Sequence, residues 1–186
     1  MGRINNPDDR SFSRDVWSHG EGNQLRDLIS SALLTLMLMP SDGRAAYFSS
    51  PWMSDFTLFD NRFRQVGGLF PRMADSTAIR FSDFLLHLSR TIPVRLITSR
   101  TETSLAFLRS FSSIESSVEY KFAPDEYHEK GILAPSLYIE GSMNITYSGL
   151  YVRGEKVTYH VDSNKLGSKK ISAAYLEFNR RWSVLP

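Results

Sequence analysis

The segment spanning residues 128–144 constrains the fold more than any other part of the chain, because it predicts a β-hairpin. Two short apolar runs, Gly131–Ala134 and Leu137–Glu140, lie on either side of Pro135 and Ser136. Proline cannot donate a hydrogen bond to a sheet ladder, so Pro135 is confined to the turn between the two strands. A hairpin of this kind brings the residues that follow its second strand back beside those that precede its first.

Polar residues stand at both of those positions. His128 and Lys130 precede the first strand, whereas Gly141, Ser142 and Asn144 follow the second. In an extended chain alternate side chains project to the same face, so His128 and Lys130 are expected to point the same way. The same holds for Ser142 and Asn144, and we therefore expect these four side chains to converge on one pocket.

The chemistry of these side chains suits a phosphate group. Histidine near its ordinary pKa can act as a nucleophile or carry a proton at neutral pH, and lysine supplies a compact positive charge. Serine and asparagine add neutral donors that stabilise charge on phosphoryl oxygens in a transition state. The chain has no cysteine, and no second histidine stands nearby at the spacing of metal ligands, so we predict neither a metal nor another cofactor.

These residues resemble the signature of the phospholipase D superfamily, in which His-x-Lys is followed at set spacings by Asp and by Gly-Ser-x-Asn. The resemblance implies that His128 attacks phosphorus to form a phosphohistidine. It implies that Lys130 and Asn144 hold the phosphate while Ser142 supports the pocket. It further implies that Glu155, at the start of a predicted strand, accepts a hydrogen bond from the other ring nitrogen of His128 and so fixes its tautomer.

One position departs from that signature. The motif Asp would fall at position 135, where this chain has proline, and the connection to Gly141 is one residue shorter than in the superfamily. The resemblance implies a mainly structural and electrostatic role for that Asp. Because this Asp is absent, an alternative is a catalytically impaired protein that binds phosphate or DNA within a larger complex. Two further alternatives are a phospholipid phosphodiesterase and a transferase that passes the phosphoryl intermediate to an alcohol.

The superfamily's mechanism uses two histidines, whereas this chain carries one His-x-Lys motif and no internal repeat. The resemblance therefore implies a homodimer, with His128 of each copy at a shared site. His160 is expected on the opposite face of its strand from Glu155, so it is not assigned as the second histidine. Together these points predict a metal-independent phosphodiesterase, above all a nuclease that acts on DNA.

A narrower likeness concerns Ser50-Pro51-Trp52 at the end of a predicted strand. This feature and the compact length look similar to phospholipase-D-like proteins of bacterial DNA-modification and phage-defence clusters, in which 7-deazapurines are placed in DNA. That likeness implies other proteins of such a system as partners. Because ligands gather beyond the carboxyl ends of strands in α/β sheets, we expect Ser50, Trp52 and Gly141 to bind substrate.

The other segments predict an α/β fold. Apolar spacing predicts helices at residues 23–39, 77–90, 103–111 and 164–182, and strands at residues 44–49, 93–99, 118–122 and 155–161. This order predicts a mixed, mostly parallel sheet with helices on both faces, as in phospholipase-D-like proteins. The aromatic and arginine-rich segment 55–73 is expected to pack, and the basic residues of the last helix, including Arg180 and Arg181, are expected on a solvated face.

Composition is that of an ordinary globular protein, since 41% of residues are hydrophobic and 23% are charged. The polar residues 1–22 lack the pattern of a secretory signal peptide and are expected to form an extension of the domain 23–186. A formal net charge of +2 permits binding to nucleic acid without requiring it. The longest apolar run, residues 32–40, is too short to span a membrane, so we expect a cytoplasmic protein.

Overall fold

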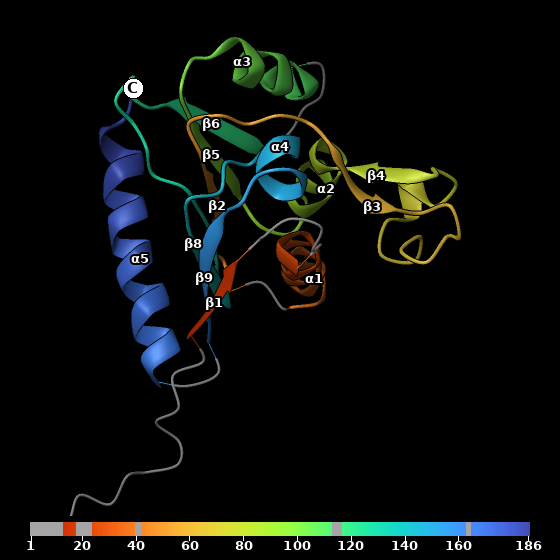
Figure 1. Ribbon diagram of the computed structural model, residues 1–186, viewed down its shortest axis with the longest axis horizontal. Helices are drawn as coiled ribbons and strands as arrows, with labels where there is room; N and C mark the ends of the chain where they lie inside the picture. The colour runs from red at the N-terminus through yellow and green to blue at the C-terminus, as the bar shows by residue number, and fades with distance from the viewer. Residues whose placement is uncertain (1–12, 18–23, 40–41, 113–116, 163–164) are drawn as a thin grey trace, which may run out of the picture.

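The computed structural model describes residues 13–17, 24–39, 42–112, 117–162 and 165–186 (Figure 1). Its centre is a seven-stranded sheet in the order β1-β9-β8-β7-β2-β5-β6. The strands are β1 (Ser13–Trp17), β2 (Ala46–Ser49), β5 (Val94–Thr98), β6 (Val118–Phe122), β7 (Gly131–Ala134), β8 (Leu137–Gly141) and β9 (Lys156–Val161). A separate two-stranded sheet pairs β3 (Thr57–Asp60) with β4 (Ala78–Arg80).

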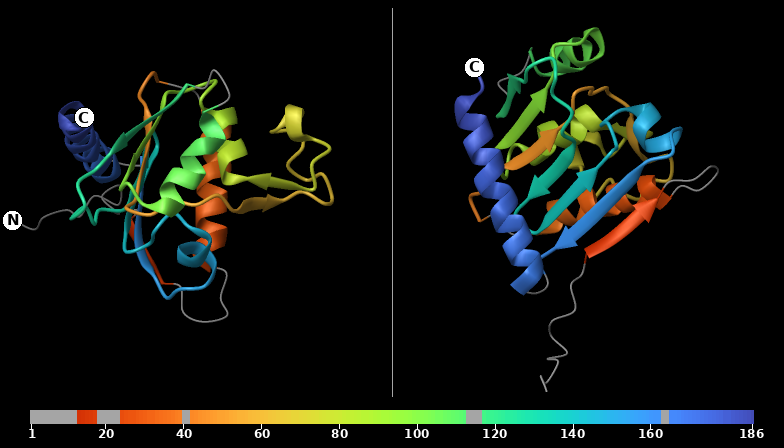
Figure 2. Two further views of the ribbon diagram at one scale, coloured as in Figure 1. Left: turned by 90° about the horizontal axis from the view of Figure 1, so that it is seen from above. Right: turned by 60° about the vertical axis from the view of Figure 1, so that its left-hand side comes forward.

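Five α-helices accompany the sheets in the described part of the chain. They are α1 (Gln24–Leu38), α2 (Phe81–Leu88), α3 (Glu102–Leu108), α4 (Tyr147–Tyr151) and α5 (Lys165–Val184). Helix α5 lies on one face of the large sheet, whereas α1 and α2 lie on the other (Figures 1 and 2). No described helix is both long and apolar enough to cross a membrane.

The large sheet is mixed, as the sequence predicts. Strand β2 pairs parallel with β5, and β5 pairs parallel with β6. The pairings β2–β7, β7–β8, β8–β9 and β1–β9 are antiparallel. The α/β class with helices on both faces is thus confirmed, while antiparallel pairings outnumber parallel ones. The reason is that the connections β2–β5 and β5–β6 pass through helices α2 and α3 and return the chain in the same direction, whereas β7 and β8 are joined by a tight turn.

The face under α5 has its own apolar core. Helix α5 confirms the predicted helix at 164–182 over its described residues, and its apolar side buries four residues: Ile171, Ala174, Tyr175 and Phe178. They pack on side chains of three adjacent strands, Tyr47 of β2, Leu133 of β7 and Ile97 of β5. Tyr47 also meets the ring of Phe178 at a centroid separation of 5.4 Å. This packing places the end of α5 against the segment that precedes β7.

The opposite face carries the larger core. Helix α1 confirms the predicted helix at 23–39 over its described residues and buries five apolar side chains: Leu25, Ile29, Ala32, Leu33 and Leu36. Aromatic rings continue this core, since Phe56 stacks on Phe81 at 5.2 Å and Phe81 stacks on Phe107 at 5.6 Å. Within the segment 55–73, Phe56 and Phe70 are buried, which confirms the packing interpretation for these rings.

Two local features differ from the sequence predictions. The predicted helix at 77–90 was wrong in its first residues, because Ala78–Arg80 pairs with β3 as a strand and the helix begins at Phe81. The start is marked by Asp83, whose carboxylate accepts the backbone N–H of Arg80 at 3.0 Å.

The second difference lies in the polar segment 1–22. Its residues Ser13–Trp17 form β1, an edge strand that pairs with β9 rather than standing apart from the domain. Asp15 of this strand forms an ion pair with Lys156 at 2.8 Å and accepts a hydrogen bond from Thr158. Polar side chains suit an edge strand that is largely exposed, which is why composition alone did not reveal it.

Candidate functional site

The predicted site residues leave the large sheet at one end. Strand β2 ends at Ser49, which pairs with Gly131, the first residue of β7. Gly131 pairs in turn with Glu140 near the end of β8. The last residue of β8, Gly141, pairs with Val157 at the start of β9. The segments before β7 and β9 and those after β2 and β8 therefore emerge side by side.

Each of these segments carries predicted residues. Lys130 directly precedes β7, Ser142 directly follows β8, Glu155 directly precedes β9 and Ser50 directly follows β2. The prediction that the hairpin brings its two polar ends together is confirmed by this register. Pro135 lies in the turn at the other end of the hairpin, as predicted.

His128 and Lys130 lie in an irregular segment between β6 and β7, not in an extended strand. The ammonium of Lys130 donates a hydrogen bond to the backbone carbonyl of His128 at 2.7 Å. Because Lys130 bends back onto His128, the two side chains do not follow the strand alternation that the sequence predicted for them. The two residues share the lining of one hollow, and His128 also lines a second.

Glu155 and Ser142 form a tight pair. The Ser142 hydroxyl donates to the Glu155 carboxylate with 2.5 Å between the oxygens, and the backbone N–H of Lys156 donates to the same hydroxyl at 3.0 Å. Glu155 is 8% exposed. Within the described chain its carboxylate therefore holds Ser142, and no hydrogen bond joins it to His128.

Asn144 is held by the loop after β2. The Ser50 hydroxyl lies 3.2 Å from the Asn144 side-chain oxygen and 2.8 Å from the backbone oxygen of Trp52, and it can donate to either. It also accepts the backbone N–H of Ile145 at 3.1 Å. Both Ser50 and Asn144 are buried. Ser50 thus contacts Asn144 in this arrangement, whereas Trp52 is half-exposed and lines a hollow.

Gly141 is required by the neighbouring strand. A Cβ atom at this position would lie 2.1 Å from the backbone oxygen of Lys156 and 2.8 Å from the Cα of Val157. Contacts this short cannot be relieved without moving the backbone of β9. The close approach of β9 therefore explains why position 141 is glycine, independently of any contact that Gly141 makes with a ligand.

A second layer of polar contacts lies under the His128 segment, and sequence analysis did not identify it. The hydroxyl of Tyr127 is hydrogen-bonded to Ser49, and burial raises its pKa. Arg181 of α5 forms ion pairs with Glu129 and, at 2.7 Å, with Glu177. The Arg181 side chain is only 15% exposed, so the predicted solvated position was wrong for this residue. Both neighbours of His128 are thus tied to other elements.

Two hollows flank His128. One, of about 440 Å³, lies on the α5 side and is lined by residues that include Lys130, Tyr138, Glu140 and Phe178. The buried His160 meets the carboxylate of Glu140, a lining residue of this hollow, at 2.9 Å. The other hollow, of about 100 Å³, lies on the side of the loop after β2.

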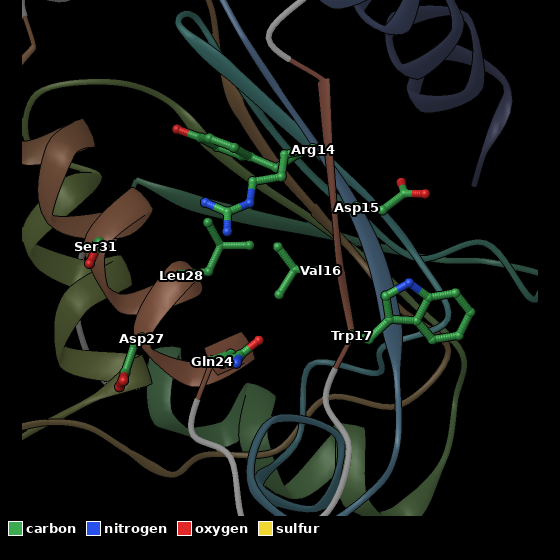
Figure 3. Close-up of a pocket in the computed structure, with 9 residues that line it drawn as sticks. Arg14, Asp15, Val16, Trp17, Gln24, Asp27, Leu28 and Ser31 are labelled. Carbon is green, nitrogen blue, oxygen red and sulfur yellow. The ribbon is translucent and has the colours of Figure 1, made fainter.

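A larger hollow, of about 740 Å³, lies between β1 and α1 (Figure 3). Arg14 and Val16 point from β1 towards α1, whereas Asp15 and Trp17 point to the opposite side of the strand (Figure 3). None of the predicted site residues lines this hollow. Among the residues that the structure describes, no cluster of three or more histidine or carboxylate side chains is arranged to hold a metal ion.

The fold of the chain is similar to that of several solved structures, although sequence comparison finds no match. No protein-family model and no curated protein sequence matches the chain. Among solved structures, Nuc from Salmonella typhimurium, a phospholipase D family member, superposes with a TM-score of 0.57 at 13% identity. The match covers 94% of this chain and 95% of Nuc. NucT from Helicobacter pylori superposes with a TM-score of 0.54 at 10% identity, over 93% of this chain and 98% of NucT.

A larger protein contains a similar unit. Phosphatidylserine synthase from Haemophilus influenzae matches with a TM-score of 0.54 at 12% identity, over 91% of this chain and 37% of the synthase. The protein is therefore an α/β protein with the fold of phospholipase D family members. The resemblance of its motifs to that superfamily and the likeness of its fold are independent observations, and they agree.

Proposed function

We propose that the protein is a metal-independent phosphodiesterase and that DNA is its substrate. The observation that carries the proposal is the gathering of the motif residues at one end of four adjacent strands, β2, β7, β8 and β9. The fold shared with a phospholipase D family member and with a phosphatidylserine synthase supports chemistry at a phosphate ester.

The proposed reaction has two steps. The imidazole of His128 attacks phosphorus, the bond to the leaving oxygen breaks, and a phosphohistidine forms. His128 of a second copy of the chain protonates the leaving oxygen as a general acid. In the second step this same histidine takes a proton from water as the water attacks phosphorus, which releases the phosphate product and restores His128.

Three other residues stabilise charge in this proposal. Lys130 and the Asn144 amide bind the non-bridging oxygens, where negative charge grows in the transition state. Glu155 is buried at the strand end from which the His128 segment also emerges. A carboxylate there favours the protonated imidazole, and in the assembled site we propose that it also orients the ring.

A second candidate is a catalytically impaired subunit that binds phosphate or DNA within a DNA-modification or defence complex. It is favoured by Pro135, which replaces the motif Asp, and by the Lys130 ammonium, which is engaged by the carbonyl of its own segment. A protein of this kind would bind the same polyanion without turning it over.

The test is cleavage in the presence of EDTA. Fluorescent single-stranded DNA, duplex DNA, bis(p-nitrophenyl) phosphate and phosphatidylcholine vesicles are incubated with the protein and with His128→Ala. The proposal predicts cleavage of DNA that His128→Ala abolishes. Tight DNA binding that survives this substitution, without cleavage of any substrate, would support the binding subunit instead. Cleavage of the vesicles alone would identify a phospholipid phosphodiesterase.

The shared site makes a separate prediction about assembly. Light scattering at micromolar concentration should give the mass of a dimer, because one chain supplies one motif histidine. An active monomer would contradict the two-histidine mechanism while leaving the phosphodiesterase activity intact.

A further inference from the structure

The hollow of about 100 Å³ beside His128 lies where three parallel strands end. Pro51 and Trp52 follow β2, the segment 99–101 follows β5, and residues of the segment 125–128 follow β6. In α/β sheets such a place, beyond the carboxyl ends of adjacent parallel strands, is where ligands bind. The hollow is therefore continuous with the proposed catalytic site, because His128 forms part of its wall.

Trp52 gives this hollow an exposed aromatic wall. Trp52 is 44% exposed. The loop that carries it is nevertheless held in place, because the backbone oxygen of Trp52 lies 2.8 Å from the Ser50 hydroxyl. The adjacent Met53 is fully buried and forms a β-bridge with Ile145. An indole ring that is left in solvent on an anchored loop is ready to stack on a planar ligand.

Arg100 adds a positive charge to the same wall. Its guanidinium carbon lies 4.4 Å from the centroid of the Phe122 ring, which holds it by a cation–π contact. Among the residues that the structure describes, Arg100 forms no ion pair with a carboxylate. Its charge is therefore available to a phosphate group.

Ser99 adds hydrogen-bonding capacity that the described chain leaves unused. The residue is 6% exposed, and its hydroxyl oxygen has no hydrogen-bond partner among the described residues. Buried hydroxyl groups are bonded in the great majority of cases, so an exception at the wall of a hollow calls for a partner from outside the chain.

We propose that this hollow binds one unpaired nucleobase next to the phosphate that His128 attacks. The base stacks on Trp52, its polar edge pairs with Ser99, and Arg100 binds the next phosphate of the strand. The hollow is smaller than the roughly 300–1,000 Å³ of pockets that enclose drug-sized ligands, which suits a single ring system. The inference rests on the proposed function in one respect, that the substrate is a nucleic acid.

The inference has a consequence for substrate class. A base inside a duplex is paired and stacked on its neighbours, and moving it out of the stack costs free energy. A site that requires a free base therefore prefers a single strand to a duplex, with aromatic stacking as its main contribution.

The test separates base binding from phosphate binding. A fluorescent single-stranded oligonucleotide and an abasic chain of the same length and charge are titrated at one salt concentration, with anisotropy as the readout. All variants carry His128→Ala, so that no cleavage occurs. Trp52→Ala should weaken binding of the oligonucleotide about tenfold and leave the abasic chain unaffected, because only stacking is lost. Trp52→Phe should retain most of the affinity.

Two controls frame this result. Arg100→Gln should weaken both chains alike, since both keep their phosphates. Phe63→Ala removes a side chain that is 81% exposed in the segment between β3 and β4, and it should change neither affinity. Melting temperatures of all variants check that each one folds.

The outcomes distinguish the inference from the proposed function. If the unsubstituted protein cleaves DNA and Trp52→Ala binds the oligonucleotide as the parent does, the base site is wrong and the phosphodiesterase stands. An equal loss for the oligonucleotide and the abasic chain also overturns the base site. If no DNA is cleaved but the stacking pattern appears, the activity is wrong and the base site stands. If the unsubstituted protein cleaves no DNA and the His128→Ala protein binds neither chain, both the activity and the base site are overturned.

Discussion

The two ends of the β7–β8 hairpin are held by different kinds of contact. At the turn, Arg44 donates to the backbone oxygen of Pro135 at 3.0 Å, and Asp162 donates its backbone N–H to Ser136 at the same distance. At the other end, polar side chains meet in pairs, and each of the first three pairs has at least one buried member: Ser142 with Glu155, Ser50 with Asn144, Tyr127 with Ser49 and Arg181 with Glu129.

The difference teaches where this fold places its polar groups. Burying a polar side chain costs free energy unless a partner is in place, so a cluster of such pairs fixes one arrangement of its members. The turn needs no such arrangement, since both contacts that hold it are accepted by main-chain oxygens. Changes at the site end are therefore expected to have large effects, and changes at the turn small ones.

The largest effect is expected for Gly141→Ala. The new methyl group would meet the β9 backbone at 2.1 Å, and overpacking of this kind should lower the free energy of unfolding by about 3 kcal/mol. Urea unfolding followed by circular dichroism measures the change. Gly68→Ala is the matched control, because a Cβ there has no neighbour within 4 Å. Equal unfolding midpoints for the two variants would contradict the account.

The second-largest effect is expected for Glu155→Gln. The amide can still accept the hydrogen bond from Ser142, so the pair survives while the negative charge is removed. We expect kcat for DNA cleavage to fall on the order of 100-fold with little change in KM, because the charge stabilises a protonated imidazole that forms during the reaction. An unchanged kcat would show that Glu155 only supports Ser142.

Arg181→Met tests the layer beneath His128. Loss of the ion pair with Glu129 should loosen the segment 127–130 and lower kcat about tenfold, since misplaced catalytic groups react slowly. Arg180→Met is the control, because Arg180 pairs with the same Glu177 at 2.9 Å but is 68% exposed. Hydrogen exchange of the amides in segment 127–130 provides a readout that does not depend on activity. Equal exchange and equal rates in the two variants would remove Arg181 from the site.

The smallest effect is expected for Pro135→Asp. This change restores the carboxylate of the superfamily motif, but at the turn end of the hairpin, with the whole of β7 between it and the site. DNA cleavage should change by no more than about twofold, whereas the free energy of unfolding should fall by about 0.5–1 kcal/mol because a proline is lost from a turn. A tenfold gain in cleavage would show that the two ends are coupled.

Sequence reasoning succeeded where the structure depends on local patterns. The turn at Pro135, the strand at 118–122 and the apolar side of α5 follow from spacing along the chain, and all are present. Sequence reasoning succeeded less well with edge and short strands. Strand β1 is polar, and the short strand Ala78–Arg80 is recognisable mainly by its pairing with β3.

The supporting residues of the site were harder to predict. Ser49 and Tyr127 are 78 positions apart, and Ser50 and Asn144 are 94 positions apart. No periodicity relates residues at such separations, because the topology of the sheet alone brings them together. Gly141 shows the same limit in another form, since the sequence predicts it as a substrate-binding residue and does not indicate that the backbone of β9 passes close to it.

The contact between α5 and Glu129 has a consequence for the order of events during synthesis. Glu129 leaves the ribosome well before Arg181, so the His128 segment is made before the residue that anchors it. Synthesis at about 5–20 residues per second leaves an interval of a few seconds between the two. During that interval a growing chain would carry all of its motif residues while Glu129 lacks its partner, so the proposed activity would reach its full level only once α5 has docked.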